Sequence, residues 1–127
     1  MEKQGAFSGS WQDSSNTITV NLPLISFKED NADIIYCPAL DISGYGYSEK
    51  EASDSFTIAL AEFFRYSINK HTFQSELIRL GWKIRKSRPM KPPDLSYLLD
   101  QNENFNRIFN THDFKKYNET ITIPIAS

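Results

Sequence analysis

The sequence predicts an α+β fold. We expect a three-stranded antiparallel sheet with a long helix packed across it and a further strand, then a C-terminal extension with short helices and a final edge strand. Three segments carry this prediction. "TITVNLPLISF" (17–27) alternates apolar and polar residues, which is typical of a half-buried strand. Residues 49–69 repeat apolar side chains at helical spacing, and "ETITIPIAS" (119–127) alternates again.

The first two strands are expected to form a hairpin. "KEDNAD" (28–33) is a polar turn, and "DIIYCPAL" (33–40) is the second strand. Pro23 has no N–H to donate to a neighbouring strand, so the first strand should lie at a sheet edge or carry a bulge.

The stretch from Asp41 to Ala52 links the sheet to the long helix. Residues 41–44 read as a tight turn and "GYGY" (44–47) as a short third strand, whose glycines permit a bend or a close backbone contact. Ser48 and Glu51 have the spacing of a capping box, which predicts a helix start here and a helix running to about Asn69.

The long helix has two apolar flanks, and each flank needs a partner. The short helix expected after Thr72 is the candidate for the second partner, and Gly81 is placed to end it. The first flank, toward the sheet, is Ala52, Phe56, Ala59, Leu60 and Phe63; the second is Thr57, Ala61, Phe64 and Ile68; the short helix offers Phe73, Leu77 and Leu80.

The remaining chain alternates short elements with a proline-rich connection. "WKIR" (82–85) fits a fourth strand, and "KSRPMKPPD" (86–94) fits a basic connection that cannot be helical. Asp94 can cap a helix through Leu99, and a weaker helical turn follows at 105–109. Pro124 places the last strand on an edge, of its own sheet or of a partner's.

Composition limits the classes of function. A chain of 127 residues with 39% hydrophobic and 24% charged residues suits one compact domain. We expect a mobile arm at 1–16, the α+β domain at 17–86 and the extension at 87–127. A net charge of -2 argues weakly against a surface built wholly for nucleic acid. With Cys37 as the only cysteine and no apolar leader or membrane-length run, a cytoplasmic protein is expected.

No catalytic, metal or cofactor site is predicted. "GYGYSE" lacks the third glycine of a dinucleotide fingerprint and has Glu49 in its place, so a turn and helix cap is the simpler reading. His71 and His112 lie in polar junctions, and Cys37 lies among apolar neighbours. The carboxylates that cluster at turns, where local hydrogen bonding favours Asp, are Asp30, Asp33 and Asp41.

Two features could serve binding. A basic cluster between residues 83 and 91 could contact phosphates or an acidic protein, or could be a solvated strand edge and linker. Tyr45 and Tyr47 should project to one side of their strand, where they mark an interface or cover a core edge. The members of the basic cluster are Lys83, Arg85, Lys86, Arg88 and Lys91.

The stretch "PALDISGYGYSEKEA" (38–52) resembles the HicB family of antitoxins, in which a strand ending in Pro-x-Leu is followed by a turn, a short strand and the Gly-x-Ser/Thr-x-x-Glu-Ala opening of a long helix. The resemblance covers about residues 20–85. The matching positions are Pro38, Leu40, Gly46, Ser48, Glu51 and Ala52.

The resemblance implies a truncated ribonuclease H-like fold without catalytic carboxylates and a non-catalytic protein that masks a small RNA-cleaving toxin. The appended DNA-binding helix-turn-helix or ribbon-helix-helix of many members has no counterpart after residue 86. We therefore expect a divergent or orphan member. The two proline-bearing edge strands and the second flank of the long helix also suggest a homodimer or higher homo-oligomer. The alternative is a nucleic-acid-binding or regulatory module that uses the 83–91 segment. The expected partner-binding residues are Tyr45, Tyr47, Arg85, Lys86 and Arg88.

Overall fold

The computed structural model describes residues 17–85 and 88–124; the expected arm at 1–16 lies outside this part of the chain. The strands are β1 (Thr17–Glu29), β2 (Ala32–Cys37), β3 (Ile42–Gly46), β4 (Lys83–Arg85), β5 (Arg88–Lys91) and β6 (Phe114–Pro124). The helices are α2 (Glu49–Asn69), α3 (Phe73–Arg79), α4 (Leu95–Gln101) and α5 (Glu103–Thr111).

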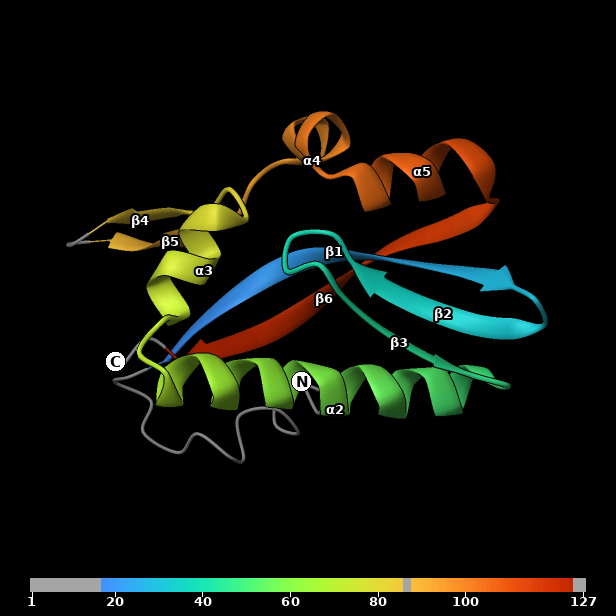
Figure 1. Cartoon of the computed structure of the whole chain (residues 1–127), viewed down its shortest axis with the longest axis horizontal. Helices are drawn as coiled ribbons and strands as arrows, with labels where there is room; N and C mark the ends of the chain where they lie inside the picture. Colours follow the sequence, from blue (N-terminus) through green and yellow to red (C-terminus); the bar gives the residue numbers. More distant parts are fainter. Residues whose placement is uncertain (1–16, 86–87, 125–127) are drawn as a thin grey trace.

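The main sheet has four antiparallel strands in the order β3-β2-β1-β6, which confirms the predicted α+β class (Figure 1). The β1–β2 hairpin is joined by Asp30 and Asn31, whose φ angles of 52° and 69° are those of a two-residue turn that follows the twist of the strands. Asp and Asn adopt this left-handed conformation more readily than most residues. The turn predicted at 28–33 is therefore present but shorter, because residues 28–29 and 32–33 belong to the two strands.

The prediction that β1 lies at a sheet edge is wrong, because β1 is the strand between β2 and β6. Its pairing with β2 covers only Ile25 to Glu29, whereas its pairing with β6 runs from Thr17 to Phe27. Pro23 therefore lies in the half of β1 that has a neighbour on one side only, opposite Asn118. Pro23 is compatible with an inner strand because the pairing of β1 with β2 begins only at Ile25, two residues later.

The final strand is an edge strand of the chain's own sheet, as one of the two expected alternatives had it. It is longer than the sequence suggested, since β6 begins at Phe114 and pairs with almost the whole of β1. Ile121 and Ile123 of this strand have 0% exposure, so the last part of the described chain belongs to the core.

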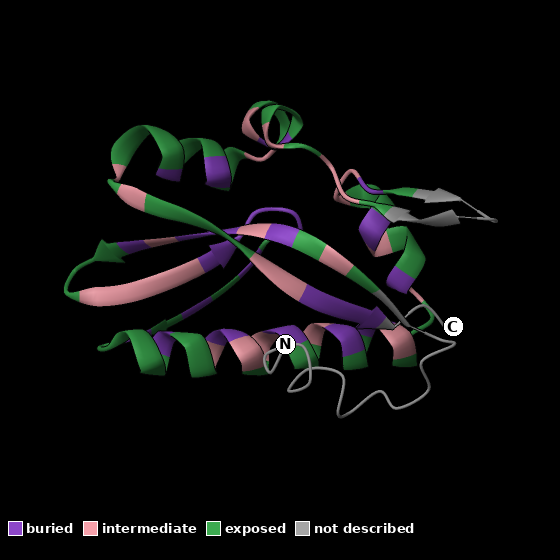
Figure 2. Ribbon diagram, turned by 180° about the vertical axis from the view of Figure 1, so that it is seen from behind, coloured by how far each residue is buried: buried purple, intermediate pink, exposed green. Residues whose placement is uncertain are grey.

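The sheet lies between two helical layers (Figure 1). α2 packs on β3 and β2, while Tyr36 of β2 points to the other face, where its ring meets Phe105 of α5 at 6.5 Å between centroids. Figure 2 shows that buried residues line the inward faces of these layers and that the outer side of α2 is exposed. The buried residues of α2 are Ala52, Phe56, Leu60, Phe64 and Ser67.

The buried face of α2 differs slightly from the predicted one. Ala59 and Phe63, predicted to lie on the sheet, are half-buried, whereas Phe64 of the second flank is 1% exposed. Phe64 meets Phe73 of α3 edge-on at 5.8 Å, so α3 is the second partner that the two-flanked helix required.

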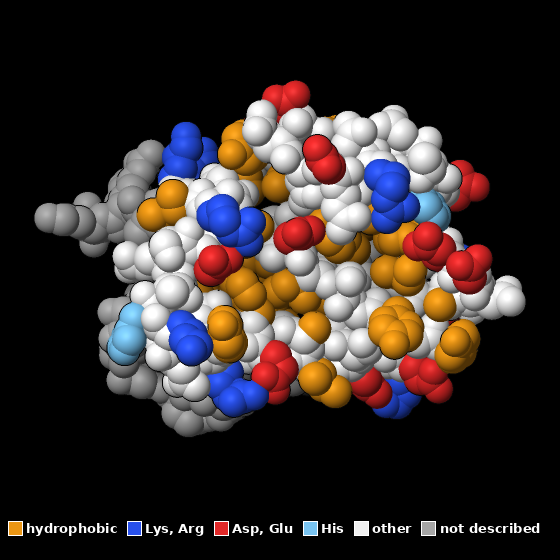
Figure 3. Space-filling model, in the orientation of Figure 1, with side chains coloured by type: hydrophobic (Ala, Val, Ile, Leu, Met, Phe, Trp, Pro, Cys, Tyr) orange, Lys and Arg blue, Asp and Glu red, His pale blue; other side chains and the backbone are white. Residues whose placement is uncertain are grey.

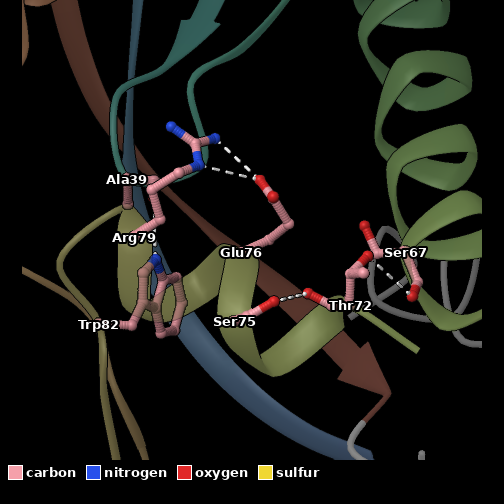
Figure 4. Close-up of polar contacts among 7 residues, drawn as sticks. All are labelled: Ala39, Ser67, Thr72, Ser75, Glu76, Arg79 and Trp82. Carbon is pink, nitrogen blue, oxygen red and sulfur yellow. Dashed lines mark hydrogen bonds and ion pairs between the residues drawn. The ribbon is translucent and has the colours of Figure 1, made fainter. Parts of the chain in front are cut away.

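The predicted fourth strand exists, but it does not join the main sheet. β4 pairs with β5 in a separate two-stranded sheet, and the segment expected to be a mere connection thus supplies a strand at Arg88–Lys91. Pro89 is compatible with β5 because a two-stranded sheet has only edges. Trp82, which is 3% exposed, precedes this hairpin and donates its Nε1–H to the Ala39 carbonyl oxygen at 2.8 Å (Figure 4).

Candidate functional site

The outer strand β3 and the start of α2 form a surface defined by Tyr45, Tyr47, Glu49, Glu51 and Asp54, hereafter the tyrosine edge. It follows from the alternation of "ISGYG" (42–46), in which every second residue faces α2 and is buried and the residues between are exposed. The side chains of Tyr45 and Tyr47 are 66% and 76% exposed.

Two glycines bring α2 into backbone contact with β3. A Cβ atom at Gly44 would lie 2.2 Å from the Phe56 amide nitrogen, and one at Gly46 would lie 2.3 Å from the Glu51 Cβ. Any larger residue would push the helix away from the strand. The predicted close backbone contact is thus confirmed, and it holds the tyrosines at a fixed height beside the helix.

The backbone of the tyrosine edge is tied to α2 by hydrogen bonds. The Tyr45 N–H donates to Ser55 Oγ at 3.1 Å, and the Tyr47 N–H donates to Glu51 Oε1 at 2.9 Å. Ser48 Oγ accepts from the Glu51 N–H at 3.1 Å, so the predicted cap is present, with the Glu51 carboxylate bound one residue earlier than in a standard capping box. Because α2 occupies these two N–H groups, a partner would be recognised through side chains more than by addition of a strand.

The two segments next to the exposed tyrosines are rich in carboxylates. Segments 28–33 and 49–54 together hold six carboxylates and two lysines, a formal charge of -4. Lys28 Nζ lies 2.5 Å from Asp33 Oδ1, and Lys50 Nζ lies 2.9 Å from Asp54 Oδ2. Each of the two lysines therefore forms an ion pair with a carboxylate of its own segment. Figure 3 shows acidic side chains gathered around hydrophobic ones toward the end of this face where α2 begins.

A hollow of about 430 Å³ separates the start of α2 from β6, with Glu49 and Tyr117 among its lining residues. Burial, and then the charges of Glu119 and Glu49, raise the pKa of the Tyr117 phenol. The adjoining hollow of about 570 Å³ shares Ser26, Asp33, Glu49 and Lys115 with the first. Lys28, Lys50 and Lys115 also line these hollows, so the surface around the end of the sheet mixes acidic and basic side chains.

A half-buried polar network, which the sequence pattern does not predict, joins both ends of the β2–β3 connection to α5. Tyr36 donates its O–H to Asp41 and accepts from Asn102 Nδ2 at 2.9 Å. Asn102 Oδ1 also caps α5 by accepting from the Phe105 N–H at 3.0 Å. Burial, reinforced by the bond to Asp41, raises the pKa of Tyr36, so the phenol stays neutral. The network fixes the segment that leads into β3. Of its members, only Asn102 could have been noticed in the sequence, because Asn is a residue type that favours the start of a helix.

The groups considered for catalysis are not brought together. Burial raises the pKa of the Cys37 thiol to about 12, which confirms the prediction of a packed thiol. His71 is exposed, while His112 lies edge-on to Phe27 with ring centroids 4.9 Å apart and Nδ1 2.8 Å from Thr111 Oγ1. Within residues 17–85 and 88–124, no three His, Cys, Asp or Glu side chains are grouped so that they could hold a metal ion.

The basic residues meet in the β4–β5 hairpin. Lys83 pairs with Lys91 and Arg85 with Arg88 across the two strands. Lys83 and Lys91 are exposed. Lys86 and the side chains of Arg85 and Arg88 lie outside the described part, so their predicted role in partner binding stays a prediction.

None of the helices described is long and apolar enough to span a bilayer. The chain matches no protein-family model, no curated protein and no solved structure.

Proposed function

We propose that this protein is a non-catalytic interaction module of the HicB antitoxin type, acting in the cytoplasm, which masks a small basic RNA-cleaving protein. The tyrosine edge is the docking surface. The single observation that carries the proposal is the exposure of Tyr45 on β3 and of Tyr47 directly after it, where hydrogen bonds to α2 hold the backbone of both residues.

Rigid placement favours high affinity. An exposed tyrosine supplies a large contact area at a low cost in side-chain entropy, and tyrosines are enriched among residues that dominate binding energy. The close approach at Gly44 and Gly46 and the bonds to Ser55 and Glu51 fix the strand before a partner arrives, so little ordering is needed on binding.

Charge favours a basic partner. Glu49, Glu51 and Asp54 are exposed at the start of α2, which begins two residues after Tyr47. Arginine and lysine side chains of a partner could stack on the rings and pair with these carboxylates, which would also raise the association rate. An RNA-cleaving protein needs such cations to bind phosphates, so covering them would block its access to RNA.

The test is co-expression with any small basic protein that a neighbouring gene encodes. Co-purification and rescue of growth are expected for the natural sequence, and both should be lost in Y45A/Y47A. Y66A is the matched control, because Tyr66 is 64% exposed on α2 and outside the tyrosine edge. Absence of co-purification and of rescue with the natural sequence would remove the antitoxin role.

A second candidate function is nucleic-acid binding through the β4–β5 hairpin. The observation that favours it is the pairing of Lys83 with Lys91, since like charges directly opposite on a ladder destabilise it unless an anion is near. A two-stranded ribbon also fits the major groove of a duplex. Retention on RNA or DNA should weaken steeply with salt, and retention unchanged in R85E/K86E/R88E would exclude this function.

A further inference from the structure

The tyrosine edge and the β4–β5 hairpin lie at opposite ends of the molecule. Figure 1 shows the hairpin beyond the C-terminal end of α2 and the end of β3 beside its N-terminal end. α2 has 21 residues. At about 1.5 Å per residue such a helix spans about 30 Å, so the hairpin cannot reach the tyrosine edge of its own chain.

The two ends carry opposite charge. Lys83 and Lys91 are exposed on the hairpin, and residues 83–91 contain no carboxylate, whereas segments 28–33 and 49–54 together carry a formal charge of -4. Asp113 and Lys115, which also line the hollow at the acidic end, cancel each other. Complementary surfaces of this size attract each other at distances up to the Debye length, about 10 Å at 0.1 M salt.

The hairpin sequence offers no carboxylate that could compensate the charges of Lys83 and Lys91. Lys83 pairs with Lys91 across the ladder, and neither forms an ion pair with a residue of the described chain. A separate two-stranded sheet is also only marginally stable without a packing partner. A surface that offers carboxylates and aromatic rings meets both needs, through ion pairs and through cation–π contacts.

We infer that the β4–β5 hairpin of one copy docks on the tyrosine edge of a second copy, so that the chains associate head to tail. The inference rests on the assignment, under the proposed function, of the tyrosine edge as a docking surface for basic partners. The contact is heterologous, because the two surfaces that meet are different, so each chain keeps one free surface of each kind and the assembly can extend or close into a ring. A basic partner competes for the same surface and disperses the assembly.

Sedimentation velocity on the full chain tests this inference. At about 20 mM salt the mean mass should rise with protein concentration above that of one chain, and at about 500 mM salt it should fall back, because screening weakens the contact. A mass of one chain at every concentration at low salt would overturn the inference.

Two variants identify the surfaces. Y45A/Y47A removes one side of the contact and K83E/K91E the other, and each variant should have the mass of one chain when alone. An equimolar mixture should yield a species of two chains and no larger one, since only one productive contact remains. A mixture that stays at the mass of one chain, or a variant that associates like the natural protein, would contradict the inference.

The control K70E/K116E changes the net charge as much as K83E/K91E does, at exposed positions outside the hairpin, and should associate like the natural protein. K83E/K91E should also retain binding to the small basic partner. If the natural protein binds the basic partner but does not associate with itself, this inference alone is refuted. If the natural protein neither binds the partner nor associates with itself, the proposed function is refuted as well.

Discussion

Trp82 and Ala39, 43 positions apart in the sequence, are joined by a hydrogen bond of 2.8 Å from the indole Nε1–H to the Ala39 carbonyl oxygen (Figure 4). The bond connects the start of the β4–β5 hairpin to the loop between β2 and β3. It therefore links the basic end of the chain to the segment that leads into the tyrosine edge.

The first prediction concerns this bond. W82F keeps an aromatic ring in the site but leaves the buried Ala39 carbonyl oxygen without its donor, and it should lower the free energy of unfolding by about 1–3 kcal/mol. Urea denaturation followed by circular dichroism measures the change. Y66F, at an exposed position, should change stability by less than about 0.5 kcal/mol. Equal stability of W82F and the natural protein would show that the bond contributes nothing.

The second prediction concerns the contact between β3 and α2. G44A places a Cβ atom 2.2 Å from the Phe56 amide nitrogen. The helix must move, and overpacking of this kind costs about 1–3 kcal/mol. Thermal or urea unfolding measures the loss, and S43A at the exposed neighbouring position is the control. If G44A were as stable as S43A, α2 would not lie against this strand.

The third prediction concerns the Tyr36 network. N102A removes the α5 cap and a donor to the Tyr36 hydroxyl, and it should cost about 1–3 kcal/mol. A double-mutant cycle with Y36F should give a coupling energy of about 0.5–3 kcal/mol, because the two side chains touch. N104A is the control at an exposed position nearby. Strict additivity of Y36F and N102A would contradict the network.

The fourth prediction concerns stability at alkaline pH. Burial raises the pKa of the Cys37 thiol in the folded protein to about 12, from the 9.0 of a thiol in water. Between these values the folded state binds more protons than the unfolded state, so stability must fall as pH rises.

In C37A the fall in stability with pH should be less steep, by about 1.4 kcal/mol per pH unit between about pH 10 and 11. The alanine variant is compared by slope and not by absolute stability, because it also leaves a small cavity. Urea denaturation at three or four pH values gives both slopes. Identical slopes for C37A and the natural protein would mean that the thiol is not shielded from solvent in the folded state.

Local patterns predicted the parts of the fold that depend on neighbouring residues. The hairpin turn at Asp30 and Asn31, the cap at Ser48 and the apolar stripe of α2 are all encoded within a few positions. The tyrosine edge follows from the same local rule. Successive residues of a strand point to opposite faces, so Tyr45 points to solvent because Gly44 faces α2.

Contacts between distant segments could not be read in this way. Asn102 meets Tyr36 across 66 positions. The first residues of β6, "FKKYN" (114–118), show no alternation of apolar and polar residues. They form a strand because β1 pairs with the whole length of β6. Pro23 was assigned to an edge strand because a sequence does not show where the second ladder of an inner strand begins.

The most direct test of the central claim is the affinity for the small basic partner, measured by titration calorimetry for the natural protein, Y45A/Y47A and Y66A. If the tyrosines dominate the interface, Y45A/Y47A should bind at least about 30-fold more weakly, equivalent to about 2 kcal/mol, while Y66A binds as the natural protein does. Equal affinity of all three proteins would contradict the assignment of the tyrosine edge as the docking surface.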